Sequence, residues 1–219
     1  MLKSYCLRSG RQTGAQKAAY NALYPCFCLP FSQSALNFAA VFDNANPVVC
    51  EIGFGMGSAT AAIAESNPQI NYLGVEVFKA GIGKLLWEIQ NRMLKNIRII
   101  EADAAQVFEF MIENESLSGI HVFFPDPWPK KRHHKRRLLQ RPFTDTLAQK
   151  LKKEGYLYMV TDWEDYAQHA LSELNQTVLL NNEFSFFAPP AQWRPQTRFE
   201  RKGLLKQHKI FELYFKRRA

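Results

Sequence analysis

The chain has 219 residues, of which 47% are hydrophobic, and its formal net charge at pH 7 is +8. This length supports one complete hydrophobic core and is short for two domains of ordinary size. The richest apolar runs, such as residues 119–124, have only strand length, which argues against a membrane-spanning helix, and the net positive charge favours nucleic acid or another anionic surface as a partner.

The first 42 residues differ in composition from the rest of the chain. They contain no Asp or Glu, and their cations are Lys3, Arg8, Arg11 and Lys17. An organelle transit peptide has a similar composition, but glycines and prolines interrupt this stretch and it shows no clean amphipathic face. We therefore predict that residues 1–42 form a flexible, phosphate-contacting basic arm and that residues 43–219 form the main domain.

The four cysteines do not predict a metal site or a disulfide framework. They lack paired metal-ligand spacing, and Cys26 and Cys28 are too close in sequence to belong to a disulfide framework; the other two are Cys6 and Cys50. A reducing compartment, the cytoplasm, fits this usage best.

Apolar strand-like runs alternate with helix-like segments from residue 48 onward. The predicted strands are 48–54, 71–77, 97–103, 119–126 and 156–162, each nearly continuously apolar, as strands buried on both faces are. The predicted helices are one that Ser58 caps and that ends before Pro68, followed by 79–95, 104–114, 138–153 and 164–175. This order predicts a mostly parallel sheet with helices on both faces.

The pattern changes after residue 182. Two further strand-like runs, 184–187 and 209–216, predict an antiparallel edge. The polar loop between them, 189–206, is long enough to indicate a functional role.

Three glycines and three acids suggest a ligand site at the edge of the sheet. Gly53, Gly55 and Gly57 stand between a strand and a helix, where the absence of side chains lets the backbone approach a cofactor closely. A plain turn is the alternative for the glycines alone. However, Glu51 precedes them, and Glu76 and Asp103 end the next two predicted strands, which favours a nucleoside-bearing ligand at this edge.

The acids also discriminate between two such ligands. A dinucleotide would require glycine where Ser58 stands, and its pyrophosphate would be repelled by Glu51. S-adenosylmethionine has no phosphate and carries a sulfonium and an ammonium group. We therefore favour this methyl donor. Glu76 would accept hydrogen bonds from the ribose hydroxyls, Asp103 would lie beside the adenine, and Glu51 would lie near the cationic portion.

A carboxylate and a cationic run follow the strand predicted over 119–126. Asp126 stands at its carboxyl end, and seven Lys or Arg residues occur between Lys130 and Arg141. Such a run attracts phosphates, and Trp128, held between two prolines, offers a stiff stacking face. A solvated basic loop is the alternative. His133 and His134 do not predict a metal site, since neighbouring cations repel a metal ion and no Cys or carboxylate completes a ligand set.

The motifs EIGFGMG, GVEV, EAD, FFPDPWPKKRHHKRR, VTDWEDYA and TRFERKG together resemble the bacterial tRNA (guanine-N7)-methyltransferase family, from residue 48 to the C-terminus. The resemblance implies methyl transfer from S-adenosylmethionine to nitrogen-7 of a guanine in tRNA, in the variable loop. Residues 43–219 would be the methyltransferase domain. The fold class is then α/β, a Rossmann-like, doubly wound, mostly parallel seven-stranded sheet with an antiparallel C-terminal edge.

The resemblance also implies roles for single residues. The cofactor-binding residues would be Glu51, Gly53, Gly55, Glu76, Asp103 and Asp126, with Asp126 also catalytic. The substrate-binding residues would be Lys130, Asp162, Thr197, Arg198, Phe199 and Glu200. The RNA-contacting residues would be Arg132, His133, His134, Lys135, Arg136 and Arg137.

Two of these roles have structural alternatives. Asp162 is also suited to capping the helix that follows it, because Asp is a favoured N-cap residue. Arg198 and Glu200 are also suited to forming an exposed surface pair.

Two rival functions remain to be weighed. A methyltransferase of the same fold acting on protein or a small molecule would not need the cationic run, and a non-catalytic RNA-binding protein would not need the full set of acids. We therefore expect an enzyme whose partner is tRNA, with no metal and no membrane, acting in the cytoplasm as a monomer or homodimer.

Overall fold

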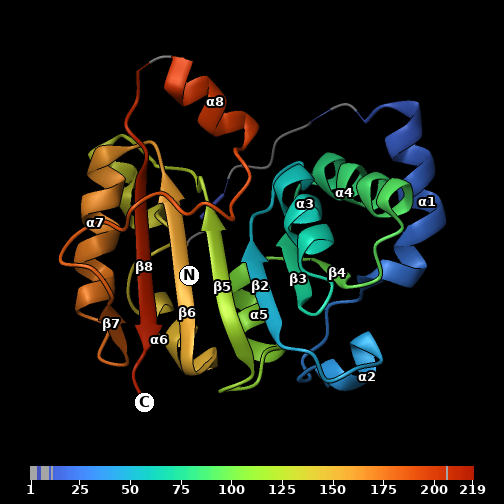
Figure 1. Cartoon of the computed structure of the whole chain (residues 1–219), viewed down its shortest axis with the longest axis horizontal. Coiled ribbons are helices and arrows are strands. Elements are labelled where there is room, and N and C mark those ends of the chain that lie inside the picture. Colours follow the sequence, from blue (N-terminus) through green and yellow to red (C-terminus); the bar gives the residue numbers. More distant parts are fainter. Residues whose placement is uncertain (1–3, 6–9, 11, 206) are drawn as a thin grey trace. The chain divides into compact units, whose positions relative to one another are not determined.

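A computed structural model of the chain describes residues 4–5, 10, 12–205 and 207–219, without the side chains of residues 198, 199 and 202. It divides into two compact units. The N-terminal unit comprises Leu7–Glu113 with Trp193–Pro195, and the C-terminal unit comprises Asn114–Gln192 and Gln196–Ala219 with Met1–Cys6. Figure 1 follows both units along the sequence by colour.

The N-terminal unit contains four parallel strands in the spatial order β1-β4-β3-β2. Their bounds are Cys28–Leu29 for β1, Val48–Ile52 for β2, Asn71–Glu76 for β3 and Ile97–Glu101 for β4. Every residue of β2 is buried, as a strand covered on both faces requires. The three strands predicted in this unit are therefore confirmed, although each ends one or two residues earlier than its sequence pattern suggested.

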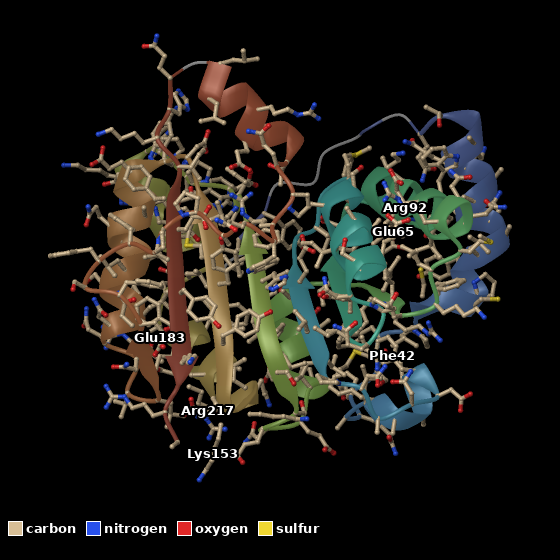
Figure 2. All side chains as sticks on the ribbon, viewed as in Figure 1. Phe42, Glu65, Arg92, Lys153, Glu183 and Arg217 are labelled. Atoms are coloured by element: carbon tan, nitrogen blue, oxygen red, sulfur yellow. The ribbon has the colours of Figure 1, made fainter. Side chains whose placement is uncertain are left out.

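Helices α3 (Ser58–Ser66), α4 (Lys79–Arg92) and α5 (Ala104–Phe110) follow β2, β3 and β4. An ion-pair network joins the first two: Arg92 lies 2.5 Å from Glu65 and 2.9 Å from Glu88. Figure 2 shows the side chains of Arg92 and Glu65, which come from α4 and α3. This network holds the two helices that flank the glycine turn.

The stretch predicted as an arm contains regular structure. Helix α1 (Gly14–Phe27) begins with a capping box between Thr13 and Gln16, and it lies along α4 (Figure 1). Strand β1 and helix α2 (Phe38–Phe42) follow it. Sequence patterning missed these elements because α1 contains Pro25 and no acidic residue in its first turn.

The boundary at residue 42 nevertheless stays a prediction. Residues 1–3, 6–9 and 11 of the expected arm lie outside the described residues.

The C-terminal unit contains four strands in the order β5-β6-β8-β7. Their bounds are Leu117–Phe123 for β5, Leu151–Thr161 for β6, Leu180–Asn182 for β7 and Phe211–Arg217 for β8. Strand β5 is parallel to β6, whereas β8 is antiparallel to both β6 and β7. The antiparallel C-terminal edge is thus confirmed, but its outer strand is 180–182, and the run predicted as a strand at 184–187 forms bends.

The described residues form eight strands, one more than predicted, because β1 lacked a recognisable strand pattern. The α/β fold class with a mostly parallel sheet is confirmed. No helix among the described residues is long and apolar enough to cross a bilayer.

Among the described residues of the C-terminal unit there are three α-helices and a 3-10 helix. Helix α7 (Glu164–Asn175) has the bounds predicted and packs against β6, β7 and β8 (Figure 1). Helix α6 (Phe143–Lys150) is shorter than the predicted helix over 138–153, because β6 already begins at Leu151. Helix α8 (Arg198–Leu205) lies inside the stretch predicted as a loop.

Candidate functional site

The glycine turn of the N-terminal unit follows β2 directly. Gly53, Gly55 and Gly57 have φ values of 74°, 57° and 68°, a left-handed conformation that residues with a Cβ adopt only with strain. A Cβ on Gly53 or Gly55 would meet no atom within 4 Å, whereas a Cβ on Gly57 would lie 2.7 Å from the Leu85 Cβ. The first two glycines thus leave open space, and the third permits close helix packing.

Ser58 does not cap α3 as the sequence suggested. The N-cap is Gly57, which makes no side-chain cap, and the Ser58 hydroxyl lies 3.3 Å from Glu88 Oε1. The prediction was wrong by one residue because the glycine turn extends to residue 57.

Glu76, at the end of β3, holds the glycine turn in place. Its Oε2 accepts a hydrogen bond from the Gly55 N–H at 2.8 Å, and its Oε1 accepts from the N–H groups of Val77 and Phe78 at 2.7 and 3.0 Å. The carboxylate is therefore fixed at the carboxyl end of the strand, where ligands bind in open α/β sheets.

Glu51 is a buried acid with an unsatisfied oxygen. It is 3% exposed, and its Oε2 has no hydrogen-bond partner among the described residues. Burial raises the pKa of Glu51 from 4.5 to about 7, and the negative charge of Glu76 adds to the rise, whereas the polar Thr60 hydroxyl offsets part of it. Such a carboxylate is stabilised as an anion when a cationic donor reaches it.

Asp103 lies two residues beyond β4 and is the N-cap of α5. Its Oδ1 accepts a hydrogen bond from the Ala105 N–H at 2.8 Å. Because β2, β3 and β4 are parallel neighbours, with Glu76 in register with Glu101, their carboxyl ends meet at one edge of the sheet. The N-terminal unit therefore brings the glycine turn, Glu51, Glu76 and Asp103 together, as the sequence predicted.

The structure adds Tyr20 to this edge. Its hydroxyl donates a hydrogen bond to Glu101 Oε2 at 2.7 Å, linking α1 to the end of β4. Sequence reasoning missed this residue because α1 itself was missed, and no motif marked it.

The loop after β5 in the C-terminal unit carries Asp126, which is half-buried. Phe124 and Trp128 on either side have φ values of 51° and 47°, which non-glycine residues adopt only where the surroundings enforce them. Trp128 is 8% exposed and donates its indole N–H to the Ser4 carbonyl at 2.9 Å. The expectation that Trp128 offers a stacking face is therefore wrong, because the indole packs within its own unit.

The cationic run forms the 3-10 helix η1 (Lys131–Arg136). Lys130, Lys131, Arg132 and Lys135 are exposed, and His133, His134 and Arg136 are half-buried. Partial desolvation and the neighbouring cations Arg132 and Arg136 hold the pKa of His133 below its ordinary value. The exposed members form a cationic surface, the kind of surface that attracts phosphates.

Arg137 departs from this pattern, since it is 2% exposed. Its guanidinium donates hydrogen bonds to Pro127 and Asp165 and is not exposed for the RNA contact that the resemblance implied.

Asp162, after β6, does not cap α7. The N-cap is Trp163, which makes no side-chain cap, and Asp162 Oδ2 instead lies 3.2 Å from Nδ1 of His208. A Cβ on Gly203 would lie 3.1 Å from the same oxygen, so α8 passes close to this carboxylate. The capping alternative is therefore wrong.

Thr197 and Glu200 bond to each other at the start of α8. The Thr197 Oγ1 accepts from the Glu200 N–H at 3.0 Å, and Glu200 Oε2 accepts from the Thr197 N–H at 3.3 Å. Glu200 is 8% exposed, so it does not belong to an exposed surface pair. The motif is a capping box. The side chains of Arg198 and Phe199 lie outside the described residues.

The predicted residues thus fall into two sets. The cofactor set, apart from Asp126, belongs to the N-terminal unit, and Asp126 belongs with the substrate and RNA sets to the C-terminal unit. Within the part of the chain that the structure describes, no three His, Cys, Asp or Glu side chains gather where they could hold a metal ion.

Comparison with known proteins places this arrangement in a family. The model of a family described as "Putative methyltransferase" matches residues 45–213. A tRNA (guanine-N(7)-)-methyltransferase of Nitrosospira multiformis is 44% identical over 217 residues, which are 99% of this chain and 95% of that protein. A tRNA (guanine-N(7)-)-methyltransferase of Bordetella pertussis is 47% identical over 216 residues, which are 99% of this chain and 85% of that protein.

Solved structures agree on the fold. The 16S rRNA methyltransferase KamB superposes with a TM-score of 0.63 at 14% identity, covering 85% of this chain and 95% of KamB. The antibiotic-resistance methyltransferase Kmr gives a TM-score of 0.58 at 12% identity, and the match covers 87% of this chain and 95% of Kmr. At such low identity, the likeness concerns the fold alone.

Proposed function

This chain belongs to the tRNA (guanine-N(7)-)-methyltransferase family, and we propose that it methylates nitrogen-7 of a guanine in the variable loop of tRNA with S-adenosylmethionine as donor. The observation that carries the proposal is the unsatisfied Oε2 of buried Glu51 beside a glycine turn with open space at residues 53 and 55. A cationic, phosphate-free ligand fits both features.

The residues of the N-terminal unit suit this cofactor. Glu51 would accept hydrogen bonds from the ammonium group and thereby gain the charge partner that its burial demands. Glu76 would accept hydrogen bonds from the ribose hydroxyls while it keeps the Gly55 backbone in position. Asp103, fixed as the cap of α5, would lie beside the adenine.

S-adenosylmethionine supplies an electrophilic methyl group when bound. Guanine nitrogen-7 carries an available lone pair and no proton, so the acceptor needs no general base. The task of the protein is therefore to hold the acceptor in line with the methyl group, and such positioning contributes as much as about 7–11 kcal/mol to a bimolecular reaction. We assign this role to Asp126, on the constrained loop between Phe124 and Trp128.

Methylation leaves the guanine with a positive charge. Carboxylates near the base stabilise that charge as it develops, and they also accept hydrogen bonds from the amino edge that distinguishes guanine from adenine. Asp126 and Asp162 are the acids that we propose for this purpose, with Lys130 and the start of α8, including Arg198 and Phe199, completing the substrate site.

The exposed cations of η1 and its flanks would bind the tRNA backbone. Lys131, Arg132 and Lys135 are exposed to solvent, and each phosphate that they neutralise releases counterions. We further propose that the protein acts in the cytoplasm as a monomer or homodimer.

The test is methylation of an unmodified tRNA transcript with labelled S-adenosylmethionine, followed by borohydride and aniline treatment, which cleaves the chain at 7-methylguanine. A single cleavage in the variable loop is expected. Label transfer without cleavage would exclude nitrogen-7 as the acceptor, and tRNA binding without label transfer would favour a non-catalytic RNA-binding protein.

A further inference from the structure

The cationic run contains one arginine that differs from all its neighbours. Arg137 directly follows η1, and its side chain is 1% exposed, whereas Arg132 and Lys135 in the same run face solvent. A buried guanidinium is costly unless its donors are satisfied, so its partners indicate what it does.

Those partners belong to two elements. The Arg137 Nε–H donates to the Pro127 carbonyl at 3.1 Å, the residue directly after Asp126. Its Nη2 donates to the carboxylate of Asp165 in the first turn of α7, and its Nη1 lies 3.5 Å from the Asp165 carbonyl. One side chain thus joins the Asp126 loop to the N-terminus of α7.

Two further contacts restrict the orientation of the guanidinium. Its central carbon lies 5.1 Å from the centre of the Tyr166 ring, and Nη2 lies 3.2 Å from Nε2 of His134. Tyr166 is itself buried and accepts a hydrogen bond from the Leu139 N–H at 3.1 Å. The planar guanidinium group of Arg137 therefore faces the Tyr166 ring, and its edges bond to Pro127 and Asp165.

We propose that Arg137 is a positioning residue for methyl transfer: it fixes the loop that carries Asp126 against α7, rather than binding an RNA phosphate. The loop needs such a support, because Phe124 and Trp128 both hold left-handed backbone conformations. The hydrogen bond that Arg137 donates to Asp165 is also the main reason that the pKa of Asp165 lies below its ordinary value.

This inference rests on the proposed function, because Asp126 must position the guanine for its loop to matter. It divides the cationic run into phosphate-binding side chains and one structural side chain. The two roles respond differently to replacement of arginine by lysine: a lysine keeps the charge that attracts a phosphate but loses the planar fork that bridges Pro127 and Asp165.

The decisive variant is therefore Arg137→Lys. Two quantities are compared with wild type: the single-turnover methylation rate at saturating tRNA and S-adenosylmethionine, and the salt dependence of tRNA binding. We expect the rate to fall about 10²-fold, the loss typical of a misplaced reacting group. The tRNA dissociation constant and its salt slope should stay within about twofold of wild type, since no phosphate contact is lost.

Arg132→Ala supplies the contrasting pattern, because an exposed phosphate-binding cation should weaken tRNA binding and reduce the salt slope by about 1. Arg141→Lys is the matched arginine control: the Arg141 side chain bonds to Glu173 of α7 and to Gln176 and, among the described residues, forms no hydrogen bond or ion pair with the Asp126 loop. Our proposal requires its rate loss to be at least about tenfold smaller than that of Arg137→Lys.

Folding of the variants is checked by their melting temperature and S-adenosylmethionine affinity. Should Arg137→Lys not fold, Asp165→Ala carries the test, because the Asp165 side chain is 62% exposed and alanine leaves no side-chain acceptor for Arg137. A rate loss of about 10²-fold in Asp165→Ala would support the bridge. Where both variants fold, their losses should not be additive.

Two results would overturn the proposal: an unchanged saturating rate in Asp165→Ala, or weaker tRNA binding with a smaller salt slope and an unchanged rate in Arg137→Lys. Failure of the wild-type protein to methylate tRNA would instead refute the proposed function, so the two failures are separable.

Discussion

Glu51 gives the sharpest prediction, because its replacement should change stability and cofactor binding in opposite directions. Its pKa is raised from 4.5 to about 7 by burial. The folded protein therefore holds a proton on Glu51 between these two pH values that the unfolded chain has already released. The free energy of unfolding must then decrease as pH rises through this window.

The magnitude follows from the same rise. At about 1.4 kcal/mol per pH unit, the ionised carboxylate costs the ligand-free protein up to about 3 kcal/mol above pH 7. Glu51→Gln removes this cost but leaves a buried amide with the same missing partner. We expect the variant to be about 1–3 kcal/mol more stable than wild type at pH 8, with little difference at pH 4.5.

Cofactor binding should change in the other direction. The ammonium group of S-adenosylmethionine would pair with ionised Glu51, so Glu51→Gln should weaken binding by about 10-fold to 100-fold, which corresponds to a charge-assisted hydrogen bond of about 1.5–3 kcal/mol. Wild-type affinity should rise between pH 6 and pH 8 as Glu51 loses its proton, and the variant should lack this rise.

The assays are urea unfolding of the ligand-free protein at pH 4.5 and pH 8 and calorimetric titration with the cofactor. Glu88→Gln is the matched control, because Glu88 is also a buried acid of the N-terminal unit. Burial opposes the ionisation of Glu88, yet hydrogen bonds from Lys84 and Arg92 hold its pKa below the usual value. That variant should lose stability at pH 8. If Glu51→Gln lost stability in the same way, the reasoning about its unsatisfied oxygen would be refuted.

Three further predictions concern the rest of the site. Asp126→Asn should lower the methylation rate by about 10²-fold with little effect on tRNA affinity; an unchanged rate in single-turnover assays would remove Asp126 from the reaction. Gly55→Ala should weaken S-adenosylmethionine binding by about tenfold or more, because φ is 57° and the new methyl group would enter the open space at the turn; calorimetry showing wild-type affinity would contradict a cofactor there. Replacing Lys131 and Arg132 together by Ala should reduce the salt slope of tRNA binding by about 2, and filter binding across a salt series that gave an unchanged slope would place the phosphates elsewhere.

The sequence was most informative where short-range patterns carry the information. Helix α7 has the bounds that its periodicity predicted, and β2, β3 and β4 match their apolar runs to within two residues at their ends. The acids Glu51, Glu76 and Asp103 were found for the same reason, because each follows or belongs to a strand whose end is visible in the sequence.

Patterns failed where long-range packing overrode local preference. Helix α1 forms along α4 despite an internal proline, and the close contact of Gly83 with Gln12 and Gln16 that permits this packing joins residues far apart in sequence. Strand β7 displaced the more strongly β-favouring run at 184–187, since pairing with β8 selects the register.

Strand order, turn glycines and charge are local properties of a chain, so they were enough to predict the fold class, the acids at one edge of the sheet and a cationic run after Asp126. Which members of that run face solvent depends instead on how the chain folds. Arg132 and Arg137 have the same side chain and the same cationic neighbourhood in sequence, yet one is exposed and the other is buried against Pro127 and Asp165. Burial and hydrogen-bond partners depend on residues that folding brings together from distant parts of the chain, and these decide whether a charge binds a ligand or supports a loop.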